Sequence, residues 1–123
     1  GHSDDTTDMD YLLGVLDRGA WIGLDQFRPY AGNPDTPDWK GRTATCKSLI
    51  DAGFGDRVML SHDWSVMAPA FGAESPDERL SASPDHYLFI SRNVLPRLRE
   101  AGVSEDDTRK LLEANPRRFF DGA

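Results

Sequence analysis

The sequence predicts an α/β fold with a parallel sheet, on the basis of three observations. Two short segments, residues 20–25 and 57–61, are apolar at their centres and lack the alternation of a half-exposed strand. A helix is predicted before each of them, and further helices follow the second. Strands that alternate with helices usually pair in parallel, with helices covering the sheet. The chain has 123 residues, which corresponds to a single domain.

The first predicted helix begins in an acidic, Thr-rich stretch, residues 4–8, that suits helix capping. Its apolar side chains recur at the spacing of one helix face: Met9, Leu12, Leu13 and Leu16. Gly19 is expected to end it. The second helix is predicted over residues 42–52 and ends at Gly53. Cys46 lies within the apolar pattern of this helix, which favours a buried structural thiol.

Two helices are predicted after the second strand, over residues 87–101 and 105–114. Pro96 lies inside the first of these, where it must occupy a first turn or produce a kink. The Asn-Pro dipeptide at 115–116 is expected to end the last helix. The two phenylalanines at 119–120 are expected to hold the end of the chain against the body of the protein.

Two long connections, residues 27–41 and 68–85, are rich in Pro and Gly. Connections of this length favour functional loops. Two parallel strands alone would each keep an unpaired edge, which is a poor basis for a stable sheet. The sequence therefore predicts that residues 1–123 form part of a larger α/β layer, or a subunit that borrows strands.

The charge and composition disfavour several classes of partner. The formal net charge of −7 disfavours binding to nucleic-acid phosphates and to anionic membrane surfaces. No apolar run has the length of a membrane-spanning helix. The single cysteine excludes an internal disulfide framework. The sequence shows neither a signal peptide nor an initiator Met, so a processed or truncated start is expected; the expected location is cytoplasmic.

Polar residues gather where the predicted strands end, which is the position of functional sites in parallel α/β folds. They form three groups: His2 with Asp4 and Asp5; Asp25 with Gln26; and His62 with Asp63 and Trp64. Histidine nitrogens and carboxylate oxygens suit zinc, manganese, iron or cobalt. A bound metal lowers the pKa of water to about 7. A carboxylate beside it can accept the proton.

Each group also fits a structural role. The aspartates at the start of the chain suit a helix N-terminus, where the dipole favours negative charge. Asp63 suits a helix cap or a loop anchor, His62 a hydrogen bond to a neighbour, and Trp64 simple packing. Composition and spacing alone leave both interpretations open.

Five segments occur in the same order, and at about the same spacing, in one known family. They are Gly1-His2-Ser3-Asp4-Asp5-Thr6, Trp21-Ile22-Gly23-Leu24-Asp25, Leu60-Ser61-His62-Asp63-Trp64, Val94-Leu95-Pro96-Arg97-Leu98-Arg99 and Asn115-Pro116-Arg117-Arg118-Phe119-Phe120. Through these segments essentially the whole chain resembles the phosphotriesterase family of the amidohydrolase superfamily. That family contains aryldialkylphosphatases, phosphotriesterase-like lactonases and phosphotriesterase-related proteins.

The resemblance implies a fold. The family adopts a (β/α)8 TIM barrel that holds two metal ions, and a full barrel needs about 250 residues. The chain would form the carboxyl-terminal part of such a metal-dependent hydrolase, from the end of strand six to the closing helices. Residues 1–123 would then be a single partial domain, and the strands outside it would explain the unpaired edges.

The resemblance also implies roles for particular residues. His2 corresponds to a ligand of one metal. Asp63 corresponds to a ligand of the other metal. In the family this aspartate also contacts the bridging hydroxide and accepts its proton. Asp5 corresponds to the aspartate that relays this proton outward, and Trp64 and Gln26 belong to the substrate pocket. Gln26 departs from the family, because organophosphate hydrolases have histidine there and lactonases often have arginine.

The implied activity is hydrolysis, in which a metal-bound hydroxide attacks a lactone, a carboxylic ester or a phosphotriester. The implied cofactor is a divalent metal, as binuclear zinc or as manganese, cobalt or iron. The implied partners are a small-molecule ester or lactone substrate and a second copy in a homodimer. The family's remaining ligands, a His-x-His pair, a carboxylated lysine and a further histidine, have no counterpart in this sequence. The alternatives are a non-catalytic truncated fragment that associates through open barrel edges, and an unrelated acidic binding module.

Overall fold

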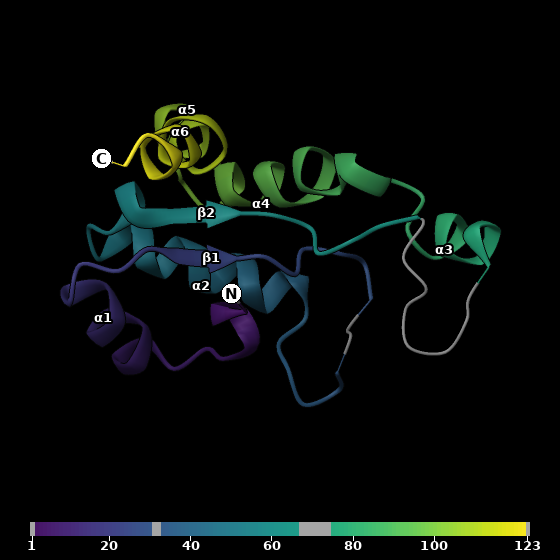
Figure 1. Ribbon diagram of the computed structural model, residues 1–123, viewed down its shortest axis with the longest axis horizontal. Helices are drawn as coiled ribbons and strands as arrows, with labels where there is room; N and C mark the ends of the chain where they lie inside the picture. Colours follow the sequence, from purple (N-terminus) through teal and green to yellow (C-terminus); the bar gives the residue numbers. More distant parts are fainter. Residues whose placement is uncertain (1, 31–32, 67–74, 123) are drawn as a thin grey trace.

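The computed structural model describes residues 2–30, 33–66 and 75–122 (Figure 1). Its helices and strands are α1 (Met9–Asp17), β1 (Ile22–Leu24), α2 (Trp39–Asp51), β2 (Val58–Leu60), α3 (Pro76–Ala82), α4 (Leu95–Glu100), α5 (Glu105–Arg109) and α6 (Asn115–Phe120). Short 3₁₀ turns lie at Ser3–Asp5, Gly55–Arg57 and His86–Leu88, and π-helical turns at Ile90–Val94 and Lys110–Ala114. No helix among the described residues is long and apolar enough to cross a membrane.

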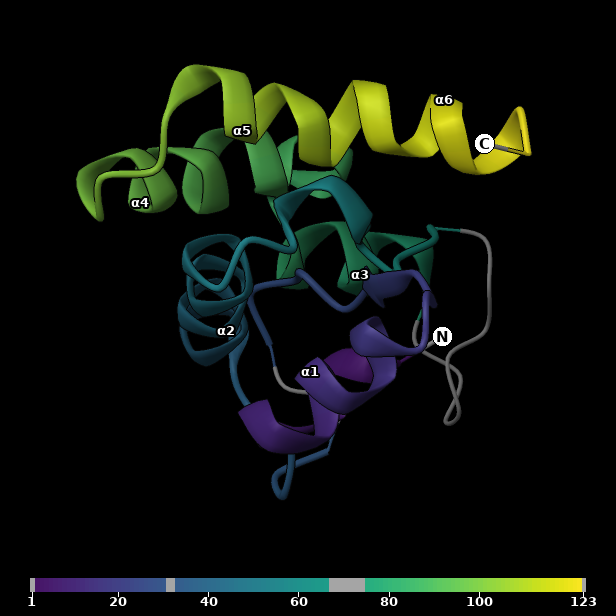
Figure 2. The ribbon, with the colours of Figure 1, turned by 90° about the vertical axis from the view of Figure 1, so that its left-hand side faces the viewer.

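The two strands pair in parallel, as the sequence predicts. Ile22 is opposite Val58, and Leu24 is opposite Leu60. The pairing continues past the strand ends, because Ser61 N–H donates to Leu24 O at 3.0 Å. Helices α1 and α2 pack together on the side of β1, and α6 lies next to β2 (Figures 1 and 2). The carboxyl ends of both strands therefore face the same end of the molecule.

One hydrophobic cluster joins the strands to the helices. Its fully buried members include Leu12, Leu16, Ile22, Leu24, Leu49, Val58, Val94, Leu98 and Leu111. Cys46 is also buried within this cluster, and burial raises the pKa of its thiol to about 12. The thiol is therefore protonated at neutral pH and is not a nucleophile, which confirms the structural role predicted for it.

Two helix starts differ from the prediction because side-chain caps determine them. Helix α2 begins at Trp39, three residues earlier than expected, since Asp38 accepts a hydrogen bond from Gly41 N–H at 2.7 Å. The connection predicted over residues 68–85 contains α3, which a reciprocal capping box between Ser75 and Glu78 begins. Residues 67–74 of that connection lie outside the described residues.

The two prolines of the last helices each follow a π-helical turn. Pro96 lies in the first turn of α4, as predicted, directly after a π-helical turn in which Leu95 N–H donates to Ile90 O. The prediction that Asn115-Pro116 ends the last helix is wrong, since α6 continues there after a second π-helical turn. A proline lacks an N–H and clashes with the preceding turn, and the wider π turn makes room for its ring.

The end of α6 packs less tightly than expected. Phe119 contacts Trp21 edge to face, with ring centroids 5.7 Å apart, as the sequence predicts for this end of the chain. Phe120, in contrast, is 83% exposed. Helical geometry points adjacent residues in different directions, so only one of the two phenylalanines can reach the body of the protein.

Asn115 fastens α6 to the start of β2. Its side chain is fully buried, and its amide nitrogen donates to the carbonyl oxygens of Gly55 and Val58, each at 2.7 Å. We expect Asn115→Ala to lower the free energy of unfolding by about 2 kcal/mol, because the buried carbonyl of Val58 and the partly buried carbonyl of Gly55 both lose this donor. Denaturant unfolding would measure this loss. Replacing the exposed Glu113 by alanine should change it by less than about 0.5 kcal/mol, and an equal loss in both variants would contradict the role of Asn115.

Candidate active site

The structure brings the three predicted polar groups to one end of the sheet. Strand β1 leads into Asp25 and Gln26, and β2 leads into residues 61–64. The 3₁₀ turn Ser3–Asp5 packs against β1 and places the first group beside the second. Phe27 N–H donates to Ser61 O at 3.2 Å, which ties the two strand exits together. Residues far apart in the sequence thus form one site at the carboxyl edge.

His2 is held by Asp25. Its Nδ1 lies 3.0 Å from Asp25 Oδ1, and its backbone N–H donates to the same carboxylate. The side-chain hydrogen bond to Asp25 and the negative charge of Asp25 raise the pKa of His2. Burial acts to raise the pKa of Asp25, but the hydrogen bonds from His2 outweigh it, and the pKa lies below its ordinary value. The negative charge of Asp63 also raises the pKa of His2. The Asp63 carboxylate is therefore close enough to act electrostatically on the His2 ring.

The orientation of the His2 ring is compatible with metal binding. With Nδ1 directed at a carboxylate, Nε2 is left for another partner, and it makes no hydrogen bond to any described residue. Metal-ligating histidines commonly donate their second N–H to a carboxylate, which sets the tautomer and the ring orientation. The carboxylate of Asp25 supplies this support to His2.

Asp4 is buried rather than placed as a charge at the start of α1. Its Oδ2 accepts from Gln26 N–H at 2.9 Å and lies 3.0 Å from Arg42 Nε. Burial raises the pKa of Asp4, and the Gln26 hydrogen bond and the Arg42 charge only partly offset this. The interpretation of Asp4 as a helix-entry charge is therefore wrong. Asp8 fills that position instead, because it accepts from Tyr11 N–H at 3.1 Å.

Asp5 and Gln26 are direct partners. Gln26 Nε2 donates to Asp5 Oδ1 at 2.6 Å, and Arg42 Nη2 lies 3.5 Å from the same oxygen. The side chain of Asp5 is 48% exposed, so the carboxylate also reaches solvent. The residue that departs from the family pattern thus contacts the predicted relay aspartate, as a hydrogen-bond donor.

Asp63 follows β2 in an unusual backbone conformation. Its φ is 45° and that of His2 is 58°, in the left-handed region that non-glycine residues rarely adopt. Such conformations cost of order 1–3 kcal/mol and gather at functional sites. Both predicted metal ligands share this feature. Arg28 Nη1 donates to Asp63 O at 2.7 Å and to Asp63 Oδ2 at 3.0 Å.

The neighbours of Asp63 pack as an aromatic cluster. Trp64 is buried, with the ring of His86 stacked on it and the edge of Tyr87 against it, at centroid distances of 5.5 Å and 5.0 Å. His86 is therefore part of this aromatic cluster. His62 Nε2 accepts from Ile90 N–H at 3.2 Å, and burial lowers its pKa. This confirms His62 as a hydrogen-bonding neighbour.

The donor set fits a divalent metal. His2, Asp4 and Asp25 each offer a ligand atom, and these atoms lie within 4.8 Å of one another. Asp4 Oδ1 is buried without a hydrogen-bond partner among the described residues. Imidazole nitrogen with carboxylate oxygen suits zinc, manganese, iron and cobalt. In this structure Asp25 bonds His2 Nδ1 and Asp4 pairs with Arg42, so a metal bound by all three residues would replace these contacts.

Two arginines of the site were missed by the sequence interpretation. Arg28 lies in a segment read as a loop, and nothing local distinguishes it. Arg42 had a signal that was not used. It stands four and seven residues before Cys46 and Leu49, on the same buried face of α2. A charge on an apolar helix face indicates a buried ion pair.

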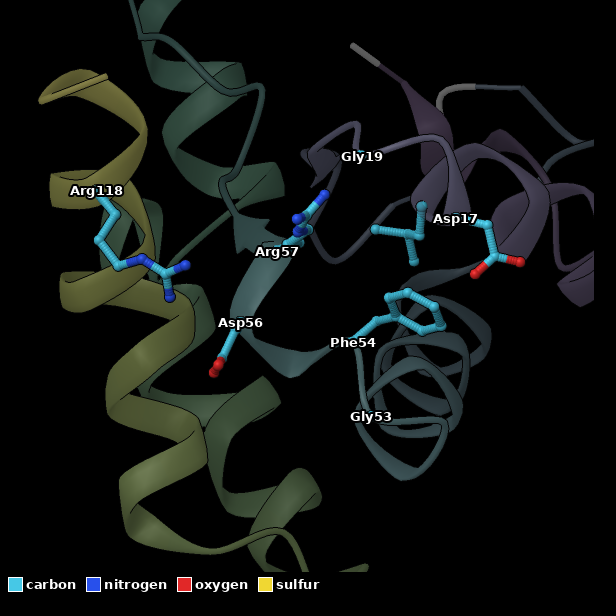
Figure 3. A pocket seen from close by; sticks show the side chains of 8 residues that line it. Asp17, Gly19, Gly53, Phe54, Asp56, Arg57 and Arg118 are labelled. Carbon is cyan, nitrogen blue, oxygen red and sulfur yellow. The ribbon is translucent and has the colours of Figure 1, made fainter. Parts of the chain in front are cut away.

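A separate cavity of about 470 Å³ lies at the other end of the strands. Figure 3 shows its lining from the end of α1, the segment before β2 and α6, including Asp17, Asp56, Arg57 and Arg118. Gly19, which also lines it, precedes β1, and Arg57 directly precedes β2. None of the predicted site residues lines this cavity, so it is distinct from the site.

The fold and the site define an α/β protein whose polar centre lies at the carboxyl ends of parallel strands, the arrangement of barrel enzymes. The model of the phosphotriesterase family matches residues 1–120. The chain belongs to this family, a family of hydrolases, and forms part of its (β/α)8 barrel.

Individual relatives agree with this assignment. The chain is 32% identical to a phosphotriesterase homology protein of Mycobacterium tuberculosis, covering 98% of the chain and 35% of the relative. It is 31% identical to an aryldialkylphosphatase of Saccharolobus solfataricus, with 98% and 37% covered. It is 29% identical to an N-acetyltaurine hydrolase of Dictyostelium discoideum, with 98% and 32% covered. The chain spans about a third of the length of these relatives.

Solved structures show the same similarity. A mutant organophosphorus hydrolase from Deinococcus radiodurans superposes with a TM-score of 0.81 at 33% identity, covering 98% of this chain and 36% of that one. A Deinococcus radiodurans PTE-like lactonase mutant gives a TM-score of 0.75 at 34% identity, with 98% and 37% covered.

Proposed function

We propose that the whole protein is a metal-dependent hydrolase in which water activated by a divalent metal attacks a lactone, a carboxylic ester or a phosphotriester. The observation that carries this proposal is the His2–Asp25 pair beside Asp63 at the carboxyl ends of adjacent strands. Both predicted ligands lie in strained backbone, which a protein retains where geometry matters for function.

His2 would hold one metal through Nε2, and Asp63 would hold the other through an oxygen of its carboxylate. A bound zinc, manganese, cobalt or iron would lower the pKa of a water molecule and polarise the bond to be cleaved. A single ligand cannot complete a four-coordinate site at either metal. The other ligands of the proposed binuclear centre would come from the part of the family fold that this chain does not cover.

Residues of this chain would then carry the proton of the attacking water to solvent. Asp63 has a carboxylate at the strand end and would accept the proton of the attacking water. Asp5 would pass it outward, and its half-exposed side chain gives it direct access to solvent. Gln26 holds Asp5 by a hydrogen bond but cannot carry a proton itself. The relay in this protein would therefore end at Asp5.

The relatives indicate the range of bonds. Their names include an aryldialkylphosphatase, a PTE-like lactonase and an N-acetyltaurine hydrolase, so phosphotriesters, lactones and an amide fall within the range of these relatives. We propose a small-molecule substrate bound between Trp64 and Gln26, and a homodimer as the assembly. The loop after Gln26 would contribute to substrate choice.

Metal removal tests the proposed function. In the protein with its complete barrel, chelation to metal-free protein is expected to abolish hydrolysis of a panel of lactones, aryl esters and phosphotriesters. Zinc, manganese or cobalt should restore it, because the activated water is lost and regained with the metal. Metal content is measured alongside initial rates. Full turnover by protein shown to be metal-free would rule the proposal out.

The alternative is a non-catalytic fragment that associates through its strand edges. In the part of the chain that the structure describes, β1 and β2 form a two-stranded sheet, so each has an edge without a strand partner. Exposed edges of this kind promote association. Sedimentation of the 123-residue chain separates the two cases. A monomeric, cooperatively folded species would argue against the fragment.

A further inference from the structure

Arg28 connects the exits of both strands. It lies in the loop after β1, yet its side chain is only 14% exposed. One nitrogen, Nη1, donates to both the carbonyl oxygen and the carboxylate of Asp63. The other, Nη2, donates to Gln26 Oε1 at 3.1 Å. A single guanidinium thus contacts the predicted metal ligand on one strand exit and the partner of Asp5 on the other.

The contact with Gln26 determines how its amide is oriented. The amide oxygen accepts from Arg28, so the amide nitrogen must face the opposite way, where it donates to Asp5 Oδ1. A rotated amide would place an N–H group against the guanidinium and an oxygen against the Asp5 carboxylate. Both contacts would be repulsive, and Arg28 therefore selects one orientation.

The contact with Asp63 holds a strained residue. Asp63 has a φ of 45°, and hydrogen bonds to its backbone and its side chain from the same nitrogen fix both at once. Arg28 bonds Oδ2 and makes no bond to Oδ1, so one carboxylate oxygen is left for another partner. Guanidinium–carboxylate hydrogen bonds are charge-assisted and directional.

We propose that Arg28 is a positioning residue of the site, which orients Asp63 for metal binding and Gln26 for its contact with Asp5. This inference rests on the proposed function. Carboxylates that bind metals are usually hydrogen-bonded themselves, and loss of such partners typically weakens metal affinity about 10- to 100-fold. The planar fork of arginine is required, because a lysine ammonium on its flexible stem does not present the same fixed pair of donors.

The test uses the complete barrel protein and measures metal affinity by competition with a chelator, with zinc as the probe. We expect Arg28→Ala to weaken zinc binding about 10- to 100-fold, and Arg28→Lys to recover only part of this loss. The matched control is Arg109→Ala, which removes an exposed guanidinium paired with Asp106 on α5 and should bind zinc like the wild type. Circular dichroism establishes that each variant is folded.

The possible outcomes distinguish a failure of the Arg28 role from a failure of the proposed function. Wild-type affinity in folded Arg28→Ala, beside a wild type that binds zinc and hydrolyses substrate, overturns the role of Arg28 and leaves the proposed function standing. Tighter binding overturns it too, since Arg28 would then compete with the metal. If the alanine variant does not fold, Arg28→Lys decides, with weaker binding in support and equal binding against. A wild type that binds no zinc, manganese or cobalt overturns the proposed function, and this role with it.

Discussion

Replacing Asp63 with asparagine is expected to reduce hydrolysis by the complete protein on the order of 10²- to 10⁴-fold. Asparagine has nearly the same shape, but its amide cannot accept a proton and is a poorer metal ligand. The Arg28 contact to the backbone carbonyl does not depend on the carboxylate, so the fold around the strand exit should persist. Initial rates at saturating metal would measure the loss.

A second aspartate provides the control. Asp17 lies at the end of α1, in the cavity at the opposite end of the sheet, and Asp17→Asn removes the same charge without touching the site. Its rates should match the wild type. Turnover in Asp63→Asn equal to that of Asp17→Asn would remove Asp63 from the mechanism.

Replacing Arg42 with alanine is expected to lower the free energy of unfolding by about 3–5 kcal/mol. The Arg42 and Asp4 side chains are 2% and 0% exposed, and their Nε and Oδ2 atoms lie 3.0 Å apart. Arg42 also donates to the backbone carbonyls of Asp4 and Pro37. Removing one partner of a buried pair leaves an uncompensated charge, which is far more damaging than losing an exposed pair. Denaturant unfolding of the variant and the wild type gives this difference.

The exposed ion pair between Arg92 and Asp85 provides the control for the loss of stability in Arg42→Ala. Arg92 pairs with Asp85 at 2.9 Å, with side chains 58% and 28% exposed. Arg92→Ala should cost no more than about 1 kcal/mol, as solvent-exposed pairs do. If Arg42→Ala is as mild as Arg92→Ala, the Arg42–Asp4 pair does not hold the 3₁₀ turn to α2.

The elements that follow from hydrophobic periodicity were predictable. The apolar spacing over residues 9–16 predicts α1, and the two apolar segments predict the parallel strands. Helix α3 was missed, because Pro and Ser in this stretch suggest a loop while they in fact form a cap. The continuation of the last helix through Pro116 was missed for a similar reason. A proline has no N–H group to donate to a regular α-helical hydrogen bond. A π-helical turn directly before the proline nevertheless lets the helix continue.

The candidate site was predictable only in part. Strand exits identify where polar residues gather, which is why Asp25, Gln26 and Asp63 could be named from their positions alone. Their pairing could not be predicted in the same way. The sequence does not say that His2 turns toward Asp25, or that Asp4 turns inward while its neighbour Asp5 stays half exposed. Those orientations depend on the 3₁₀ turn and on Arg42, which reaches Asp4 from α2.

The sequence by itself determined the class of fold, the ends of the strands and the family, because these depend on local spacing and on short ordered motifs. Only the tertiary structure decided which charges hold the site together. Arg28 and Asp63 are 35 residues apart in sequence, and Arg42 and Asp4 are 38 apart. Such contacts form when packing brings distant segments together and burial makes an unpaired charge costly. A local pattern can mark Arg42 as a buried charge, but it does not specify the partner of either arginine.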